Sequence, residues 1–323
     1  MEEQKLPDNI SRVLVTGATG FIGSHTCDTL LETGKTVMGI DDLSTGKLAN
    51  LAGASRQDTF SFHQADVCEE DTIAKVFTDF QPDAVIHLAA LVSVPIAEKN
   101  PGENFRINVL GTKTVAKAAL RAATKRIVFA SSAAVYGNSD DLPLCEEGPV
   151  NPVNQYGMAK LEAENLLLAY EKSQGLITTC LRFFNVYGPR QDPSSPYSGV
   201  ISIFAEHCKT GQPVTVYGDG HQSRDFIFVK DIARAVTASA TNTALPGGIY
   251  NLCSGKGKTL LELLEILAEI HPDIPAPFFK EHRAGDIRHS LGDPAAARTK
   301  LGFSATTSFA EGIRELLTSI RGQ

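Results

Sequence analysis

Short apolar runs rich in β-branched residues alternate along the chain with longer stretches in which apolar residues recur every three or four positions. Each run is almost continuously apolar, as in strands that are buried on both faces. The runs lie at residues 13–15, 36–40, 60–65, 84–89, 126–131 and 176–182, and two of the amphipathic stretches between them cover residues 103–122 and 156–173. This order predicts an α/β fold built on a doubly wound parallel sheet.

The pattern loosens after Phe183. Short strands are predicted at residues 214–217 and 225–228, and helices near residues 202–209, 229–241, 259–270 and 308–320. We therefore expect a smaller α/β lobe beside the sheet. The predicted division gives a cofactor-binding domain of residues 10–184 with a returning segment of about 225–252, and a substrate-binding lobe of residues 185–224 and 253–323. Ligands of open α/β sheets bind where the strands end.

Composition narrows the class of protein. Of 323 residues, 42% are apolar and 21% charged, which is typical of a folded globular chain. The net charge of −7 argues against nucleic acids and anionic membranes as partners. Six cysteines show no C-x-x-C pair, so neither a metal site nor a disulfide framework is expected. The longest apolar stretch, residues 84–97, contains His87 and Pro95, and with a polar N-terminus this favours a cytoplasmic protein without a membrane span.

Three glycines follow the first predicted strand in the segment TGATGFIGSH. Gly17, Gly20 and Gly23 would let the turn close tightly and bring backbone N–H groups at a helix N-terminus close to a pyrophosphate. A glycine triplet alone also fits an ordinary strand–helix turn.

Acidic residues after the next strands support a dinucleotide site. Asp41 stands 18 residues after Gly23, where a carboxylate can accept hydrogen bonds from ribose hydroxyls. Asp42 beside it would repel a 2′-phosphate, so NAD is favoured over NADP. Asp66 and Val67 follow the third strand, where Asp66 either contacts the adenine or caps the next helix.

Tyr156 and Lys160 are four residues apart in a helical pattern, which places them on one face about 6 Å apart along the axis. A tyrosine used as a base at neutral pH needs its phenolate stabilised by roughly 4 kcal/mol, and a lysine ammonium has the right sign. Taken alone, the spacing fits a surface Tyr–Lys pair. Ser132 follows the fifth strand and would face the same cleft, which makes the three residues together a more specific signal.

These motifs resemble the extended short-chain dehydrogenase/reductase superfamily and, within it, the nucleotide-sugar 4-epimerases. The resemblance covers Val13 to about Asp293, through the stretches TGATGFIGSH, HLAA, NVLGT, SSAAVYG, YGMAK, RFFNVYGPRQ, SRDFIFVKD and RAGD. It implies a Rossmann fold, a homodimer formed through the helices at 103–122 and 156–173, and catalysis by Ser132, Tyr156 and Lys160.

The resemblance also implies where the ligands bind. NAD would contact Gly17, Gly20, Phe21, Ile22, Gly23, Asp41, Asp42, Asp66, Val67, Leu88, Ala89, Ala90, Asn108, Tyr156 and Lys160. A UDP-sugar would contact Ser93, Ser132, Asn185, Thr215, Tyr217, Arg224, Arg283 and Ser290. Guanidinium groups suit a diphosphate in an acidic protein. Arg224 and Arg283 also fit solvated ion pairs, Asn185 a turn cap and Ser290 a plain surface serine.

Related enzymes differ after the catalytic serine. The similar 4,6-dehydratases carry an Asp-Glu pair there and the decarboxylases a Glu, whereas this chain has Ala133 and Ala134. The resemblance therefore implies epimerisation at C4 through a 4-keto sugar. Ser290 is small and stands at a position that is Tyr in hexose epimerases, so the resemblance favours UDP-GlcNAc and UDP-GalNAc, with UDP-glucose and UDP-galactose as further substrates. Val92 departs from the pattern of the hexose epimerases, many of which carry a Lys there. The alternatives are a UDP-glucose 4-epimerase only, or a non-catalytic NAD-binding regulator.

Overall fold

The computed structural model describes residues 10–192, 199–282 and 287–321. Its centre is a parallel sheet of seven strands in the order β10-β6-β5-β4-β1-β2-β3. The strands are β1 (Arg12–Thr16), β2 (Thr36–Asp41), β3 (Phe60–Gln64), β4 (Ala84–His87), β5 (Arg126–Ser132), β6 (Ile177–Phe183) and β10 (Gly248–Leu252). The predicted doubly wound α/β fold is confirmed.

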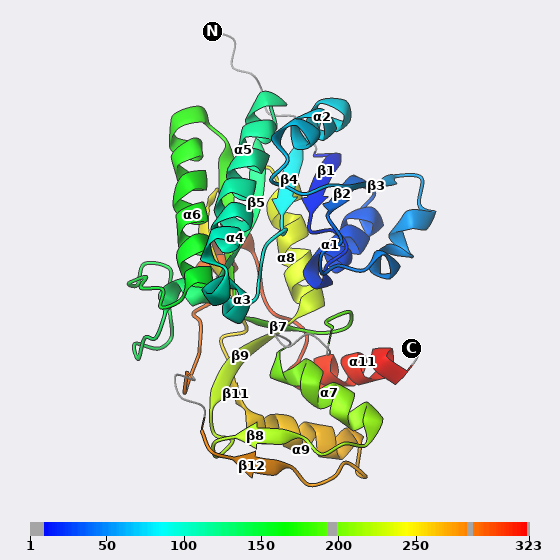
Figure 1. The fold of residues 1–323 in the computed structure, drawn as a ribbon, viewed down its shortest axis with the longest axis vertical. Helices are drawn as coiled ribbons and strands as arrows, with labels where there is room; N and C mark the ends of the chain where they lie inside the picture. The colour runs from blue at the N-terminus through cyan, green and yellow to red at the C-terminus, as the bar shows by residue number, and fades with distance from the viewer. Residues whose placement is uncertain (1–9, 193–198, 283–286, 322–323) are drawn as a thin grey trace.

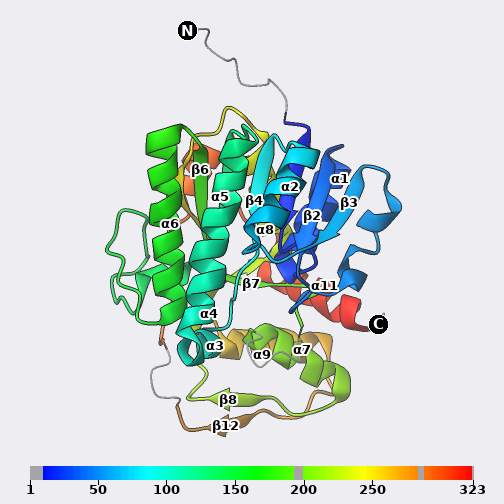
Figure 2. The ribbon, with the colours of Figure 1, turned by 45° about the horizontal axis from the view of Figure 1, so that its top comes forward.

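Helices cover both faces of this sheet (Figures 1 and 2). α1 (Phe21–Glu32) and α8 (Val229–Thr241) pack together on one face. On the other lie α2 (Glu70–Phe80), α5 (Thr112–Arg121) and α6 (Gln155–Gln174). Side chains alternate in the same way, since Val13 and Val15 join one apolar cluster and Leu14 between them joins the other. Burial on both faces explains why the inner strands are mostly apolar, whereas the edge strand β3 is partly exposed and carries polar residues.

The predicted helix at 103–122 is interrupted. α3 (Val94–Lys99) and α4 (Pro101–Phe105) precede a π-helical turn, η3 (Arg106–Gly111), which leads into α5. Such turns are rare and occur mostly at functional sites. Shorter 3-10 turns are η1 (Leu48–Leu51), η2 (Ala54–Arg56) and η4 (Ala133–Tyr136).

A second group of elements lies below the carboxyl ends of the parallel strands (Figure 1). Its strands are β7 (Asn185–Tyr187), β8 (Thr215–Tyr217), β9 (Ser223–Phe228), β11 (Gly257–Thr259) and β12 (Phe278–Lys280). Its helices are α7 (Val200–Thr210), α9 (Leu260–Ile270) and α11 (Phe309–Arg321). α10 (Ala295–Leu301) packs instead against α8 and against β10 of the large sheet. β9 pairs with β7 and β11, and β8 pairs with β12.

This second group has its own apolar core, which includes Phe204, Val216 and Leu263. The chain returns to the large sheet through α8 and β10, as the predicted returning segment requires, although β9 at its start belongs to the small sheet. The exact division into two domains stays a prediction.

Candidate active site

The turn between β1 and α1 is shaped by glycines that nothing larger can replace. Gly17 has a φ of +71°, and a Cβ there would lie 2.8 Å from the backbone nitrogen of Ala89. A Cβ on Gly23 would lie 1.9 Å from the carbonyl oxygen of Gly17. The turn therefore packs directly against the loop that follows β4, and α1 packs directly against the turn, which is the close approach expected of this motif.

The N-terminus of α1 suits a pyrophosphate. Gly20 is its N-cap and brings no side chain to the helix end, and the first turn, which includes the predicted Phe21 and Ile22, carries no acidic residue. Free backbone N–H groups and the positive end of the helix dipole favour an anion there. Among the described residues, the buried Thr19 Oγ1 also has no hydrogen-bond partner. The residues present thus fit the phosphates of NAD.

Asp41 and Asp42 lie in different environments. Asp41 is buried, and its two carboxylate oxygens accept hydrogen bonds from the backbone of Thr19 at 3.0 Å and of Leu43 at 2.9 Å. Asp42 is exposed and accepts from the backbone and hydroxyl of Ser44. The fixed, buried carboxylate of Asp41 is therefore better placed to recognise a ribose, and both roles stay predictions.

Asp66 is held by neighbouring residues. It accepts hydrogen bonds from the Cys68 backbone and from Arg106 Nη1, both at 2.8 Å. Burial opposes its ionisation, but these hydrogen bonds outweigh burial and lower the pKa of Asp66. The N-cap position of α2 is Glu69, and no side chain forms a capping hydrogen bond there, so Asp66 does not cap that helix. The contact of Asp66 and Val67 with adenine stays a prediction.

The loop after β4 is tied down on two sides. Leu88 and Ala89 donate their backbone N–H groups to the carbonyl and hydroxyl oxygens of Thr16. Asn108, from the π-helical turn, bonds both the N–H and the carbonyl of Leu91 at 3.0 Å. The buried Asn108 amide thus fixes the loop predicted to line the cofactor, which includes Ala90, and its direct contact with NAD stays a prediction.

His87 links these parts through one directional chain of hydrogen bonds. Thr112 Oγ1 donates to the Asn108 carbonyl, so it accepts from His87 Nε2 at 3.0 Å. His87 Nδ1 then accepts from Thr16 Oγ1 at 2.7 Å. This arrangement requires a neutral ring. Burial and the nearby charge of Lys160 lower the pKa of His87 to about 3, which agrees.

The structure brings Ser132, Tyr156 and Lys160 together. Ser132 ends β5, and its hydroxyl accepts from the Ala134 backbone at 3.1 Å and is hydrogen-bonded with Tyr156. Lys160 is buried, with Nζ 5.8 Å from the centre of the Tyr156 ring and 2.8 Å from the carbonyl oxygen of Ala130, to which it donates. A surface Tyr–Lys pair does not describe these residues.

The helix that carries Tyr156 begins against the catalytic turn. Asn154 caps α6 by accepting from the Gly157 backbone at 2.8 Å. A Cβ on Gly157 would lie 2.6 Å from the carbonyl oxygen of Ala134, so α6 touches η4 there. This contact brings the first turn of α6, which carries Tyr156, against the turn that Ser132 caps.

Neither ionisable group is ready for catalysis without a ligand. Burial raises the pKa of Tyr156 to about 12, although its hydrogen bond with Ser132 lowers it. Burial lowers the pKa of Lys160 to about 7, which the charge of Glu164 partly offsets. Ionising Tyr156 at pH 7 from a pKa of about 12 costs roughly 7 kcal/mol. A base at this position therefore needs further positive charge.

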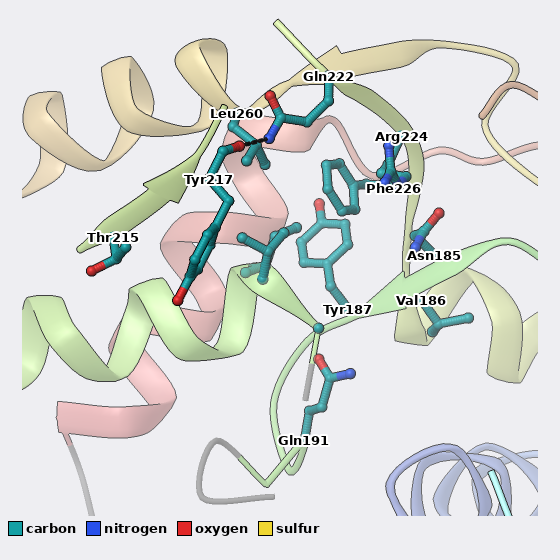
Figure 3. A pocket seen from close by; sticks show the side chains of 13 residues that line it. Asn185, Val186, Tyr187, Gln191, Thr215, Tyr217, Gln222, Arg224, Phe226 and Leu260 are labelled. Carbon is teal, nitrogen blue, oxygen red and sulfur yellow. Dashed lines mark hydrogen bonds between the residues drawn. The ribbon is translucent and has the colours of Figure 1, made fainter. Parts of the chain in front are cut away.

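A pocket of about 250 Å³ opens between β7, β8, β9 and α7 (Figure 3). It is lined by four predicted substrate residues, with Asn185 and Arg224 on one side in this view and Thr215 and Tyr217 on the other. Their contact with a UDP-sugar stays a prediction.

Three further predicted residues lie elsewhere. Ser93 is buried and caps α3 by accepting from the Ile96 backbone at 3.1 Å. Ser290 donates its backbone N–H to the carbonyl of Ser223, next to Arg224, and does not line the pocket. Arg283 lies outside the described residues. The roles of all three in substrate binding stay predictions.

Several pocket and site residues were not predicted from the sequence. Gln191, Gln222 and Phe226 also line the pocket, and Gln222 Nε2 holds the Tyr217 carbonyl at 2.6 Å. Gln191 lies within the stretch RFFNVYGPRQ, which was the only sequence signal for it.

In the part of the chain that the structure describes, no helix is long and apolar enough to cross a lipid bilayer. Nor do three or more metal-binding side chains gather within residues 10–192, 199–282 and 287–321.

Comparison with known proteins matches residues 13–253 to the family model described as "NAD dependent epimerase/dehydratase family". A UDP-glucose 4-epimerase of Mycolicibacterium smegmatis is 37% identical over 97% of this chain and 99% of its own length. The dTDP-glucose 4,6-dehydratase of Neisseria gonorrhoeae is 33% identical, with 94% and 93% covered. Among solved structures, UDP-N-acetylglucosamine 4-epimerase from Methanobrevibacter ruminantium M1, in complex with UDP-N-acetylmuramic acid, gives a TM-score of 0.91 at 37% identity, covering 97% of this chain and 99% of that one.

Proposed function

Since the chain belongs to the NAD dependent epimerase/dehydratase family and NAD is its cofactor, we propose that it interconverts the C4 epimers of a UDP-sugar. The division into a cofactor domain and a UDP-sugar lobe, with the boundaries predicted above, is part of this proposal. The observation that carries it is the turn after β5.

In that turn the Ser132 hydroxyl is hydrogen-bonded with Tyr156, and the next two side chains are the methyl groups of Ala133 and Ala134. Elimination of water from a sugar needs a further acid and base beside the one that acts on O4. Alanine offers neither. A site with one proton-transfer group at O4 suits removal and return of hydrogen at C4, which is epimerisation.

Each group in the proposed active site has a separate role. When bound, NAD supplies the acceptor and donor of the C4 hydride, and its oxidised ring adds a positive charge. Tyr156 takes the O4 proton as the alcohol becomes a ketone and gives it back when the ketone is reduced. Ser132 holds O4 and relays the proton. Lys160 stabilises the Tyr156 phenolate and binds the nicotinamide ribose.

We assign the substrate to the UDP-sugars that carry an N-acetyl group at C2. Ser290 is small, and its backbone is fixed to Ser223 beside Arg224, so a residue without bulk stands at the predicted sugar site. Val92 is 64% exposed and adds no charge there. The pocket volume is below the roughly 300–1,000 Å³ of most ligand sites, so it would hold the uridine end and leave the sugar outside.

Three alternatives make different predictions. A UDP-glucose 4-epimerase, the printed name of the Mycolicibacterium relative, would leave UDP-GlcNAc unchanged. A 4,6-dehydratase, the name of the Neisseria relative, would form a 4-keto-6-deoxy product. A non-catalytic regulator would bind NAD and turn over nothing, although it would have no need for a buried Lys160 beside Tyr156.

The test is turnover of four substrates by the NAD-loaded protein. UDP-GlcNAc, UDP-GalNAc, UDP-glucose and UDP-galactose are incubated separately, and chromatography resolves the 4-epimers. We expect all four to be converted to their 4-epimers, with a higher kcat/KM for the acetylated pair. A protein that carries NAD and converts none of them would refute the proposed function.

We also propose a homodimer through the helices predicted for it. Phe105, Leu110 and Met158 are exposed apolar side chains on α4, η3 and α6. Burying such side chains against a second copy would remove them from water. Light scattering of the purified protein should give twice the monomer mass of 34.6 kDa, and a monomer at micromolar concentration would contradict this.

A further inference from the structure

Glu164 and Arg182 form an ion pair in the interior, close to the catalytic residues. Arg182 Nε lies 3.0 Å from Glu164 Oε1 and Nη2 lies 2.8 Å from Oε2. Their side chains are only 1% and 3% exposed. Removing two charges from water costs several kcal/mol each, and an apolar pair often stabilises a fold as well. Fold stability alone therefore does not explain this buried ion pair well. Its position beside the catalytic residues explains it better.

One end of the pair meets the catalytic helix. Glu164 follows Lys160 by four residues in α6 and lies on the same helical face, about 6 Å further along the axis. Arg182 stands on β6, in register with Asn251 of β10. The pair therefore fastens the helix that carries Tyr156 and Lys160 to the sheet.

The other end meets the turn that carries Ser132. The guanidinium carbon of Arg182 lies 4.8 Å from the centre of the Tyr136 ring. Tyr136 ends η4, the turn that Ser132 caps, and its hydroxyl donates to Asn251 Oδ1 at 2.7 Å. Both catalytic elements are therefore held by the same guanidinium, although neither Glu164 nor Arg182 belongs to the catalytic set.

The groups that face Lys160 are few. α6 contributes Tyr156 and Glu164, β4 contributes the neutral ring of His87, and β5 contributes the Phe129 ring and the Ala130 carbonyl. Burial lowers the pKa of Lys160, and Glu164 is the group whose charge raises it. Arg182 carries the opposite charge and is bonded to that carboxylate through Nε and Nη2.

We propose that Glu164 and Arg182 are positioning residues of the active site. Glu164 supplies a negative charge one helical turn behind Lys160, and Arg182 joins that helix to the turn of Ser132. The inference rests on the proposed function, because it gives the pair a part in proton transfer at Tyr156.

The first test compares three variants. Glu164→Gln removes the charge and keeps the shape. Glu164→Gln combined with Arg182→Met also removes the guanidinium left unpaired, so that the fold is restored. Glu162→Gln removes an exposed carboxylate from the same helix as a control.

We expect the alkaline limb of kcat to move about one pH unit lower in both Glu164 variants, because a neighbouring opposite charge shifts a pKa by that order. At a pH above this limb, kcat of the Glu164 variants should be about tenfold lower than that of the wild type. The KM for the UDP-sugar should stay within about twofold of the wild-type value, because the substrate pocket lies on other elements. Glu162→Gln should keep the wild-type profile. A double variant with wild-type stability and a wild-type pH profile would show that the pair is only structural.

A second measurement needs no turnover. Denaturant unfolding is followed against pH, with Lys160→Met as the reference. The folded protein loses the Lys160 proton at a pKa of about 7 and the unfolded chain near 10.4, so the relative stability rises with pH above about 7. In Glu164→Gln this rise should begin about one pH unit lower.

The two measurements separate the two proposals. A wild-type protein without epimerase activity would refute the proposed function, and the unfolding series would still decide the role of Glu164. An unchanged onset in Glu164→Gln would overturn the inference whatever the activity.

Discussion

The catalytic side and the substrate side of the cleft are built in different ways. On the catalytic side, Lys160, His87 and Asn108 are each at most 2% exposed and bonded to neighbouring backbone or side chains. On the substrate side, Asn185 is exposed and Arg224 is half-buried, and the pocket is assembled from β7, α7, β8 and β9.

The difference follows from where the residues lie in the chain. The catalytic side groups come from the ends of parallel strands and from helix starts beside them, whose places the sheet fixes. The pocket residues come from short strands and the segments between them, where substitutions disturb less packing. Substitutions on the catalytic side should therefore affect the reaction itself. Substitutions on the substrate side should affect which UDP-sugar is accepted.

The largest effect is expected where the catalytic side is tightest. Gly23→Ala would place a Cβ 1.9 Å from the Gly17 carbonyl oxygen. Because that oxygen belongs to the backbone, the clash can be relieved only by moving the turn. We expect a loss of more than about 3 kcal/mol in the free energy of unfolding and loss of bound NAD. Denaturant unfolding and the NAD content of purified protein measure this.

Gly102→Ala is the matched control, because a Cβ there meets nothing within 4 Å. It should keep NAD and gain up to about 1 kcal/mol from its place in α4. If Gly23→Ala matched this control, the turn would not be the close contact described.

Tyr156→Phe tests the catalytic side without disturbing its packing. Removing the hydroxyl should lower kcat at least ~100-fold, the scale of a general acid–base contribution, with folding and NAD content unchanged. Tyr170→Phe on the same helix is the control and should retain activity. Steady-state kinetics that show less than a fivefold loss would remove Tyr156 from its role as the base.

Ser290→Tyr tests the substrate side. A tyrosine ring should fill the space of an acetamido group while leaving room for a hydroxyl. Overpacking costs about 1–3 kcal/mol, so kcat/KM for UDP-GlcNAc should fall roughly 5- to 150-fold, with little change for UDP-glucose. Parallel losses on both substrates, at equal NAD content, would return the substrate assignment to the hexoses.

The smallest effect concerns acid stability. Burial lowers the pKa of His25 to about 4 and that of His87 to about 3. The unfolded chain binds these protons near pH 6.5 and the folded protein only below pH 4, so the free energy of unfolding falls as the pH drops below 6.5. Between pH 7 and 5.5 the loss should be about 1 kcal/mol for each histidine.

In His25→Gln, the free energy of unfolding should fall by about 1 kcal/mol less between pH 7 and 5.5 than in the wild type. The exposed His221 on the substrate side is the control, and His221→Gln should show the same fall as the wild type. The measurement is denaturant unfolding at the two pH values. Equal pH dependence in wild type and His25→Gln would mean that His25 is not held neutral.

Sequence reasoning succeeded where local pattern and position in the sheet are enough. The continuous apolar runs gave β1 to β6 within a few residues, and the Y-x-x-x-K spacing placed Tyr156 and Lys160 on one helical face. Ser132 followed from its position at the end of β5.

It failed where distant segments meet. No local pattern predicts the π-helical turn in the middle of an amphipathic run or the pairing of β8 with β12. The burial of the Glu164–Arg182 pair is likewise invisible in the sequence, because charged residues on helices usually face solvent. The sequence also did not predict that the Ser93 hydroxyl caps α3; its contact with the substrate stays a prediction.

The most direct test of C4 epimerisation is a proton NMR spectrum of the product formed from UDP-GlcNAc in D₂O. Hydride that leaves C4 and returns to it never exchanges with solvent, so the 4-epimer should form with hydrogen retained at C4, C5 and C6. Tyr156→Phe should form it at least ~100-fold more slowly. A 4-keto-6-deoxy product with deuterium from solvent would contradict epimerisation and show that the protein is a dehydratase.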